Sequence, residues 1–208
     1  MPTAIGESDG GGFVYKALMK IVIIGNSGSG KTWLATRLAS LAPLTVIHLD
    51  ELFWLPGGFD RKRSAEELAS LITQKRIMPS WVVEGVFGEL ATPFLEDAQA
   101  LIWLNPGWPV CRRRLPARGS ESKAHMGRAQ SEAGLARLLE WAPAYSSRDD
   151  TRSYKGHLSL FQQFPRHRLC LQTEEDAVSL VDLAMQAGVS EALQRAATDT
   201  AECPSPTP

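Results

Sequence analysis

The fold is decided by residues 20–32, which read Lys-Ile-Val-Ile-Ile-Gly-Asn-Ser-Gly-Ser-Gly-Lys-Thr. A short β-branched run breaks into a glycine-rich loop, in which Gly25 and Gly30 bracket four residues before Lys31 and Thr32. This is a complete P-loop, whose backbone N–H groups point at a phosphate beside the N-terminus of the next helix. Apolar residues follow it at the helical spacing that the motif requires, namely Trp33, Leu34, Leu38 and Leu41. We therefore predict that the loop binds a nucleotide phosphate.

Each residue type in this loop has a chemical role. Glycine is needed where a Cβ would block close approach of the backbone, and Lys31 supplies a mobile cation for the β- and γ-phosphates. The Thr32 hydroxyl is a candidate Mg²⁺ ligand, so ATP and Mg²⁺ are the expected cofactors. The expected ATP-binding set is the whole loop: Gly25, Asn26, Ser27, Gly28, Ser29, Gly30, Lys31 and Thr32.

The composition favours one domain and excludes several classes of protein. A chain of 208 residues is long enough for a single core, and its net charge of −1 argues against a broad surface for DNA or anionic membrane. The three cysteines, Cys111, Cys170 and Cys203, are scattered without metal-ligand spacing, so neither a disulfide framework nor a zinc site is expected. No apolar run approaches the ~20 residues of a membrane span. We predict a cytoplasmic monomer or homodimer.

The two ends of the chain differ from its middle. A polar, glycine-rich stretch precedes the first strand, and the last residues carry three prolines and little apolar content. We predict that residues 1–18 and 191–208 are disordered and that residues 19–190 form the domain. Met19 is a candidate alternative start, which mass spectrometry of the natural N-terminus would decide.

Apolar runs alternate with helical patterns along the domain. Besides the first strand, strands are expected at 44–49, 81–84, 100–104 and 168–171, and helices at 31–42, 64–76, 108–118, 131–145 and 174–187. Five such β-α units predict an α/β fold, a parallel sheet with helices on both faces. A polar stretch at about 118–129 has the composition of a mobile connection, and we predict that it forms a lid.

Polar residues at the carboxyl ends of the strands are the candidates for chemistry, because ligands of open α/β sheets collect there. Asp50 follows the second strand directly, where its carboxylate would accept a proton from an attacking hydroxyl or hold hydrated Mg²⁺. The alternative is an aspartate that caps the next turn. Glu51 is adjacent and could share the role.

Two further segments are candidates for binding the acceptor. Residues 52–59 are aromatic and rich in turn residues, so Trp54 could wall an acceptor pocket or simply pack on the sheet. Glu84 closes the third strand and is a candidate contact for substrate or magnesium. Gly85 follows it, and its missing side chain would let a substrate approach the backbone. The alternative for this pair is a structural turn.

The arginines after the fourth strand are candidates for the transition state. Arg114 and Arg118 are four residues apart and share one helical face, where they could stabilise charge on a transferring phosphoryl group. The alternative is an ordinary solvated helix face. The four histidines have no spacing typical of a metal site or a triad, so packing or solvent exposure is expected for His48, His125, His157 and His167.

Several segments together resemble one family. These are the P-loop, His48-Leu49-Asp50 with Phe53-Trp54, Trp81-Val82-Val83-Glu84-Gly85, and Ile102-Trp103-Leu104-Asn105-Pro106 leading to the arginines. They resemble the adenylate-kinase-related P-loop proteins often labelled "DNA topology modulation protein" or FlaR-like, over about residues 19–187. The resemblance implies a three-layer P-loop NTPase fold with a five-stranded parallel sheet of order 2-3-1-4-5 and a small lid. It also implies ATP-dependent phosphoryl transfer to a small acceptor.

The chain departs from that family at two positions. Glu84 stands where the family usually has Asp before Gly, and Asn105 stands where Asp before Pro is common. We predict a small-molecule or nucleotide kinase whose catalytic residues are Lys31, Asp50, Arg114 and Arg118. Its acceptor would be bound by Asp50, Trp54, Glu84 and Gly85, and its Mg²⁺ by Thr32 and, through water, Asp50. The alternative is a nucleotide-dependent regulatory or binding protein with weak ATPase activity, for which DNA is a candidate partner.

Overall fold

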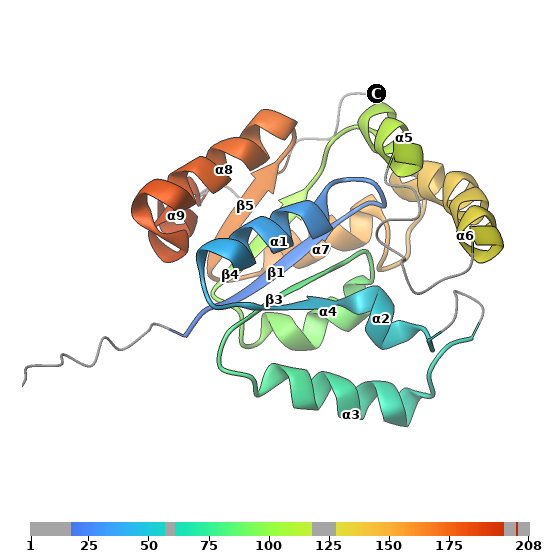
Figure 1. The fold of residues 1–208 in the computed structure, drawn as a ribbon, viewed down its shortest axis with the longest axis horizontal. Coiled ribbons are helices and arrows are strands. Elements are labelled where there is room, and N and C mark those ends of the chain that lie inside the picture. The colour runs from blue at the N-terminus through green and yellow to red at the C-terminus, as the bar shows by residue number, and fades with distance from the viewer. Residues whose placement is uncertain (1–17, 57–60, 118–127, 198–202, 204–208) are drawn as a thin grey trace, which may run out of the picture.

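The computed structural model describes residues 18–56, 61–117, 128–197 and 203 (Figure 1). Five parallel strands form one sheet in the order β2-β3-β1-β4-β5, which confirms the predicted order 2-3-1-4-5. The strands are β1 (Lys20–Gly25), β2 (Thr45–His48), β3 (Trp81–Gly85), β4 (Ala100–Leu104) and β5 (His167–Leu171).

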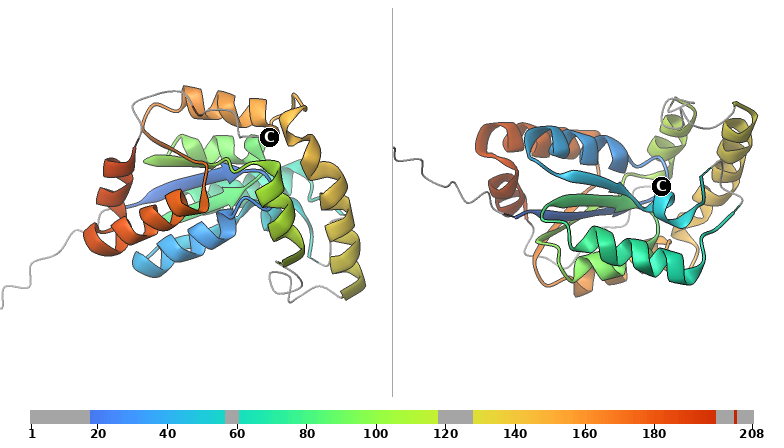
Figure 2. Two further views of the ribbon diagram at one scale, coloured as in Figure 1. Left: turned by 90° about the horizontal axis from the view of Figure 1, so that it is seen from above. Right: turned by 60° about the horizontal axis from the view of Figure 1, so that its bottom comes forward.

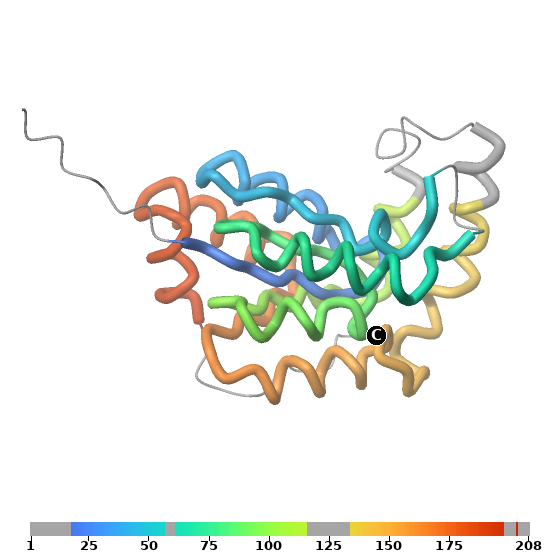
Figure 3. Tube along the Cα trace, turned by 90° about the horizontal axis from the view of Figure 1, so that it is seen from below, coloured from blue at the N-terminus to red at the C-terminus, as the bar shows by residue number. Residues whose placement is uncertain are grey.

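Helices cover both faces of the sheet. They are α1 (Lys31–Leu41), α2 (Leu49–Phe53), α3 (Ala65–Arg76), α4 (Gly88–Leu95), α5 (Trp108–Ala117), α6 (Arg128–Trp141), the 3-10 helix η2 (Ala142–Ser146), α7 (Tyr154–Gln163), α8 (Glu174–Ala187) and α9 (Val189–Ala196). Helices α1, α8 and α9 pack on one face, and α3, α4 and α7 pack on the other (Figures 1 and 2). Helices α5 and α6 lie at the end of the molecule where β1 terminates, opposite α9 (Figure 3).

The central strand shows why the sheet is buried on both sides. Ile21 and Ile23 belong to the core cluster under α1 and α8, whereas Val22 and Ile24 belong to the cluster under α4 and α7. All four side chains have no exposed surface. Because successive side chains of a strand point to opposite faces, a run that is apolar throughout requires a covering layer on each face.

The predicted helices are largely confirmed, with one correction. Helices α3 and α8 start at capping boxes headed by Ser64 and Thr173, which satisfy N–H groups of their first turns. The helix expected at 131–145 is instead α6 followed by η2. Pro143 explains the change, because proline in a helix interior removes one hydrogen bond and clashes with the preceding turn.

The C-terminal region also differs from prediction. The expected domain end at residue 190 falls inside α9, whose Ala192 and Leu193 are buried against the sheet layer. Cys170 in β5 and Cys203 form a disulfide with a Cα–Cα distance of 5.7 Å, so the expectation of no disulfide was wrong. Disulfides persist mainly in oxidising compartments, so the cysteines no longer support a reducing compartment for this protein. The cytoplasmic location stays a prediction.

Two other predictions concern segments that fall wholly or mostly outside the described residues, namely the lid and the N-terminus. Of the predicted lid, residues 118–127 lie outside the described residues, and α6 begins at Arg128. Of the N-terminus predicted to be disordered, residues 1–18, all but residue 18 also lie outside them. Within the described ranges, no helix is both long and apolar enough to cross a membrane.

Candidate active site

The P-loop connects β1 to α1 at the carboxyl end of the sheet. Its glycines are required by close packing against the chain itself. A Cβ on Gly25 would lie 2.3 Å from the carbonyl oxygen of Leu104, and one on Gly28 would lie 2.5 Å from that of Cys111. Gly28 also has a φ of +81°, which disfavours other residues. The loop is therefore held between the end of β4 and the first turns of α5.

Lys31 lies folded over this loop. Its Nζ donates a hydrogen bond of 2.8 Å to the carbonyl oxygen of Asn26, and the residue is 7% exposed. The Asn26 side chain accepts from the backbone N–H of Ser27 and donates to the carbonyl oxygen of Ala142 in η2, at 3.1 Å. The loop is thus tied to η2 as well as to β4 and α5.

A buried carboxylate stands beside Thr32. Glu84 ends the buried run of β3 and is 6% exposed, and its Oε1 accepts hydrogen bonds from the Thr32 hydroxyl at 2.9 Å and from His48 Nδ1 at 2.7 Å. Burial alone would raise the pKa of Glu84, but the His48 hydrogen bond, the Lys31 charge and the Thr32 hydroxyl bring it below the usual value. Glu84 is therefore ionised at neutral pH and directed at the P-loop threonine.

His48 is a site residue that the sequence reasoning missed. We expected packing or solvent exposure for it, but it ends β2 directly opposite Glu84 in the parallel register. The hydrogen bond to Glu84 raises the pKa of His48, and the charges of Glu51 and Asp50 act in the same direction against desolvation. The one signal in the sequence was its place near the carboxyl end of a predicted strand.

Asp50 lies in the first turn of α2, immediately after β2. The position predicted for it at the carboxyl end of the sheet is confirmed, and its carboxylate is close enough to His48 to act on that pKa. The residue is exposed. Its roles as base and as a magnesium contact through water stay predictions.

An aromatic cluster lies next to Asp50. Phe53 contacts Phe87 with ring centroids 4.6 Å apart, and Trp54 meets Phe53 edge-on at 4.7 Å. The guanidinium of Arg152 lies over both phenyl rings, 4.9 Å from Phe53 and 4.3 Å from Phe87, and its Nε donates to Glu89 at 2.7 Å. Phe53 packs against the core, as one of the two interpretations of this segment expected, and Trp54 is partly buried beside it. The role of Trp54 in binding an acceptor stays a prediction.

The structure corrects the expectation for Gly85. A Cβ at this position would lie 2.7 Å from the Cβ of Leu49, which is fully buried. The space beside Gly85 is therefore filled by protein and does not admit a substrate to the backbone.

Of the two predicted arginines, Arg114 is placed at the P-loop. It donates to the carbonyl oxygen of Ser29 at 3.1 Å and pairs with Glu174, at the start of α8, at 2.8 Å. Arg118 lies outside the described residues, so the proposed pair on one helix face stays a prediction.

The oxygen groups at this end of the sheet suit a hard cation. The Thr32 hydroxyl and the Glu84 carboxylate are hydrogen-bonded to each other and are ligands of the kind that Mg²⁺ prefers, and Asp50 adds a carboxylate directly after β2. Among the described residues there is no group of three or more His, Cys, Asp or Glu side chains that could hold a metal. The arrangement fits an ion shared between one or two protein oxygens and the phosphates of a nucleotide, which is how Mg²⁺ commonly binds.

No protein-family model matches the sequence, and no curated protein matches it. Solved structures similar to the chain include a gluconokinase from Sinorhizobium meliloti 1021 and a shikimate kinase from Acinetobacter baumannii in complex with shikimate, each 17% identical. They have TM-scores of 0.47 and 0.48, and the matches cover 87% and 85% of this chain and 95% and 96% of theirs. A deoxyadenosine kinase from M. mycoides is 14% identical, with a TM-score of 0.40 over 81% of this chain and 97% of its own.

The structural neighbours named here are kinases. With TM-scores below 0.5, these likenesses carry no argument about this chain, and the FlaR-like resemblance stays a prediction. Sheet order and P-loop position establish the fold independently, because the loop follows the central strand β1 and precedes α1.

Proposed function

We propose that this protein transfers the γ-phosphoryl group of Mg-ATP to the hydroxyl or phosphate of a small acceptor. The observation that carries the proposal is the contact between Glu84 and Thr32, which places an ionised carboxylate against the P-loop hydroxyl, with the Lys31 ammonium acting on the same carboxylate. This combination provides anion-binding and cation-binding groups side by side at a helix N-terminus.

Phosphate binding is the task of Lys31 and the loop amides. In the structure Lys31 is bonded to the Asn26 carbonyl oxygen, and a triphosphate would draw its ammonium to the β- and γ-phosphates. Arg114 already touches the loop at Ser29 and would add positive charge over the phosphates, with Arg118 as its predicted helper.

Thr32 and Glu84 are the residues that would hold Mg²⁺, directly or through water, with Asp50 as a further contact through water. A bound Mg²⁺ supplies neutralisation of the negative charge that develops on the phosphates. His48 keeps Glu84 oriented and ionised, so the Thr32 hydroxyl has a fixed acceptor for its proton. Its oxygen lone pairs would remain available to the ion.

Asp50 is proposed to act on the acceptor. Its carboxylate would take the proton of an acceptor hydroxyl while the hydroxyl oxygen bonds to the γ-phosphorus and the bond from phosphorus to the ADP oxygen breaks. Trp54 and the neighbouring aromatic cluster would bind the apolar or flat part of the acceptor. The aromatic composition favours an organic acceptor over water alone.

The test is ADP release from Mg-ATP across a panel of nucleoside monophosphates, nucleosides and hydroxylated metabolites, with Lys31→Ala as the blank. The proposal predicts that one acceptor class raises turnover well above the blank, and that Asp50→Asn abolishes this stimulation while ATP binding is retained. ATP binding without stimulation by any acceptor would contradict the proposal. It would favour the nucleotide-dependent regulatory protein, for which salt-dependent retention on DNA is the next measurement.

A further inference from the structure

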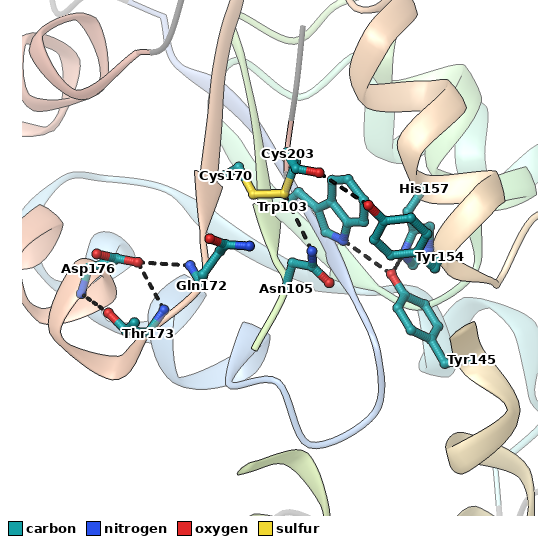
Figure 4. The surroundings of a disulfide bond; sticks show 10 residues. All are labelled: Trp103, Asn105, Tyr145, Tyr154, His157, Cys170, Gln172, Thr173, Asp176 and Cys203. Carbon is teal, nitrogen blue, oxygen red and sulfur yellow. Dashed lines mark hydrogen bonds between the residues drawn. A yellow bond between two sulfur atoms is a disulfide. The ribbon is translucent and has the colours of Figure 1, made fainter. Parts of the chain in front are cut away.

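A chain of buried hydrogen bonds crosses the molecule beneath the candidate site. The indole N–H of Trp103 in β4 donates to the hydroxyl of Tyr145 in η2 at 3.1 Å, and that hydroxyl lies 2.7 Å from Nδ1 of His157 in α7 (Figure 4). Nε2 of His157 lies 3.0 Å from the carbonyl oxygen of Val86, in the turn between β3 and α4. Trp103 and His157 have no exposed surface, and Tyr145 is 6% exposed.

Only one arrangement of protons satisfies this chain. A carbonyl oxygen can only accept, so Nε2 of His157 carries the proton that is donated to Val86. The Trp103 indole can only donate, so the Tyr145 hydroxyl accepts from it and gives its own proton to Nδ1 of His157. A second proton on His157 would leave the Tyr145 hydroxyl proton without its acceptor in a buried site. Burial, which lowers the pKa of His157 to about 3, agrees with a neutral ring.

Two members of this chain connect it to the candidate site. Val86 comes directly after Glu84 and Gly85, so the bond from His157 to its carbonyl oxygen holds the turn that leaves β3. Tyr145 lies in η2, which also carries Ala142, whose carbonyl oxygen accepts from the Asn26 side chain of the P-loop. Asn26 in turn holds Lys31 through its own carbonyl oxygen. The buried chain therefore links the P-loop, through η2, to the turn that follows Glu84.

We propose that His157 is a positioning residue, which sets the turn after Glu84 relative to the P-loop through Val86 and Tyr145. It touches neither nucleotide nor acceptor, and acts by holding the two halves of the site at a fixed spacing. This inference rests on the proposed phosphoryl transfer. Rates of such reactions depend on spacing, because a misplacement of about 1 Å can lower a rate about 100-fold.

The kinetic test compares three variants of the full chain. His157→Phe puts a phenyl ring in place of the imidazole and removes the hydrogen bonds to Val86 and Tyr145. Tyr145→Phe removes only the hydroxyl that joins His157 to η2. We expect each to lower kcat about 10-fold or more and to raise the KM for the acceptor, with the KM for ATP nearly unchanged. His157→Gln retains one donor and one acceptor and is expected to lose less.

Phe161→Leu is the matched control. Phe161 lies one turn further along α7, is fully buried and packs on the same Trp103 ring, with ring centroids 5.7 Å apart, but no hydrogen bond joins its side chain to Val86 or Tyr145. It should lower the unfolding temperature with kcat and both KM values unchanged. Equal kinetics for His157→Phe and Phe161→Leu, at a temperature where both are folded, would overturn the proposal.

A second measurement needs no turnover. In ¹⁵N-labelled protein, we expect His157 to give the NMR pattern of the neutral ring protonated at Nε2, and that N–H signal to shift when Mg·AMP-PNP is added. In Tyr145→Phe the shift should be lost, because the link to η2 and the P-loop is broken. A ring protonated at Nδ1, or a signal that ignores the nucleotide in the wild type, would refute the positioning role. Absence of acceptor-stimulated turnover alone would instead count against the proposed function.

Discussion

Acid should destabilise this protein through His157, by an amount that follows from burial. The ring is fully buried, and burial is the first cause of a pKa lowered to about 3, with the nearby positive charge of Lys31 acting in the same direction. In the unfolded chain the pKa returns to about 6.5. Because the folded pKa is the lower one, only the unfolded state takes up the proton as the pH falls below 6.5. The contribution of His157 to stability is therefore retained above that pH and lost below it.

The linkage relation gives the size of the effect. Between pH 6.5 and 4.5 the free energy of unfolding should fall by about 2 kcal/mol on account of His157 alone, at a slope approaching about 1.4 kcal/mol per pH unit. The assay is urea unfolding at pH 6.5, 5.5 and 4.5 for the wild type and for His157→Gln. Protonation of carboxylates with lowered pKa values, such as Glu84 and Glu89, also lowers the free energy of unfolding in acid, but it does so in both proteins.

The difference between the two proteins isolates the histidine. We expect the stability advantage of the wild type over His157→Gln to shrink by about 2 kcal/mol across this range. An advantage that stays constant with pH would refute the reasoning, because it would mean that His157 titrates in the folded protein as it does in the unfolded chain.

Three further predictions concern other parts of the molecule. Reduction of the Cys170–Cys203 disulfide should lower the free energy of unfolding by about 3 to 4 kcal/mol in urea titrations, because the bond closes a loop with a sequence separation of 33. An unaltered urea midpoint, or an equal response of Cys203→Ser to the reductant, would contradict this prediction. Glu84→Gln removes the negative charge beside Thr32, so it should lower acceptor-stimulated turnover about 10- to 100-fold and raise the Mg²⁺ concentration needed for half-maximal rate. An unchanged Mg²⁺ titration would count against a role of Glu84 in holding Mg²⁺. Ser64→Ala should lower the free energy of unfolding by about 1 kcal/mol, because α3 loses its N-cap, and Ser64→Asn should retain most of that stability. Melting temperatures measured by circular dichroism check both variants.

Features that depend on short stretches of chain were predictable. The P-loop, the apolar strands and the capped helices α3 and α8 are each coded within about a dozen consecutive residues, and the structure shows them close to the expected bounds. The short helices α2, α4, α7 and α9 were not predicted. Helix α2 has five residues, and α4 carries Pro93 in its interior, so neither displays a long periodic pattern.

The candidate site was predictable only in part, because some of its contacts depend on strand register. Glu84 was identified as a strand-end carboxylate, but its partner His48 lies 36 residues away and becomes a neighbour only when β2 pairs with β3. The role of Gly85 was misjudged for the same reason. Its missing side chain accommodates Leu49 from the adjacent segment, and no local pattern records that contact.

The sequence by itself determined the glycine-rich P-loop and the class of fold. Backbone conformation, and burial on both faces of a strand, follow from residue types that are close together in the chain. The tertiary structure alone decided which distant groups meet: Cys170 with Cys203, Glu84 with His48, and His157 with Tyr145 and Val86. The physical reason is that a hydrogen bond or a disulfide requires positions accurate to a fraction of an ångström. Such accuracy arises only when the packed layers fix the spacing of segments that lie far apart in the sequence.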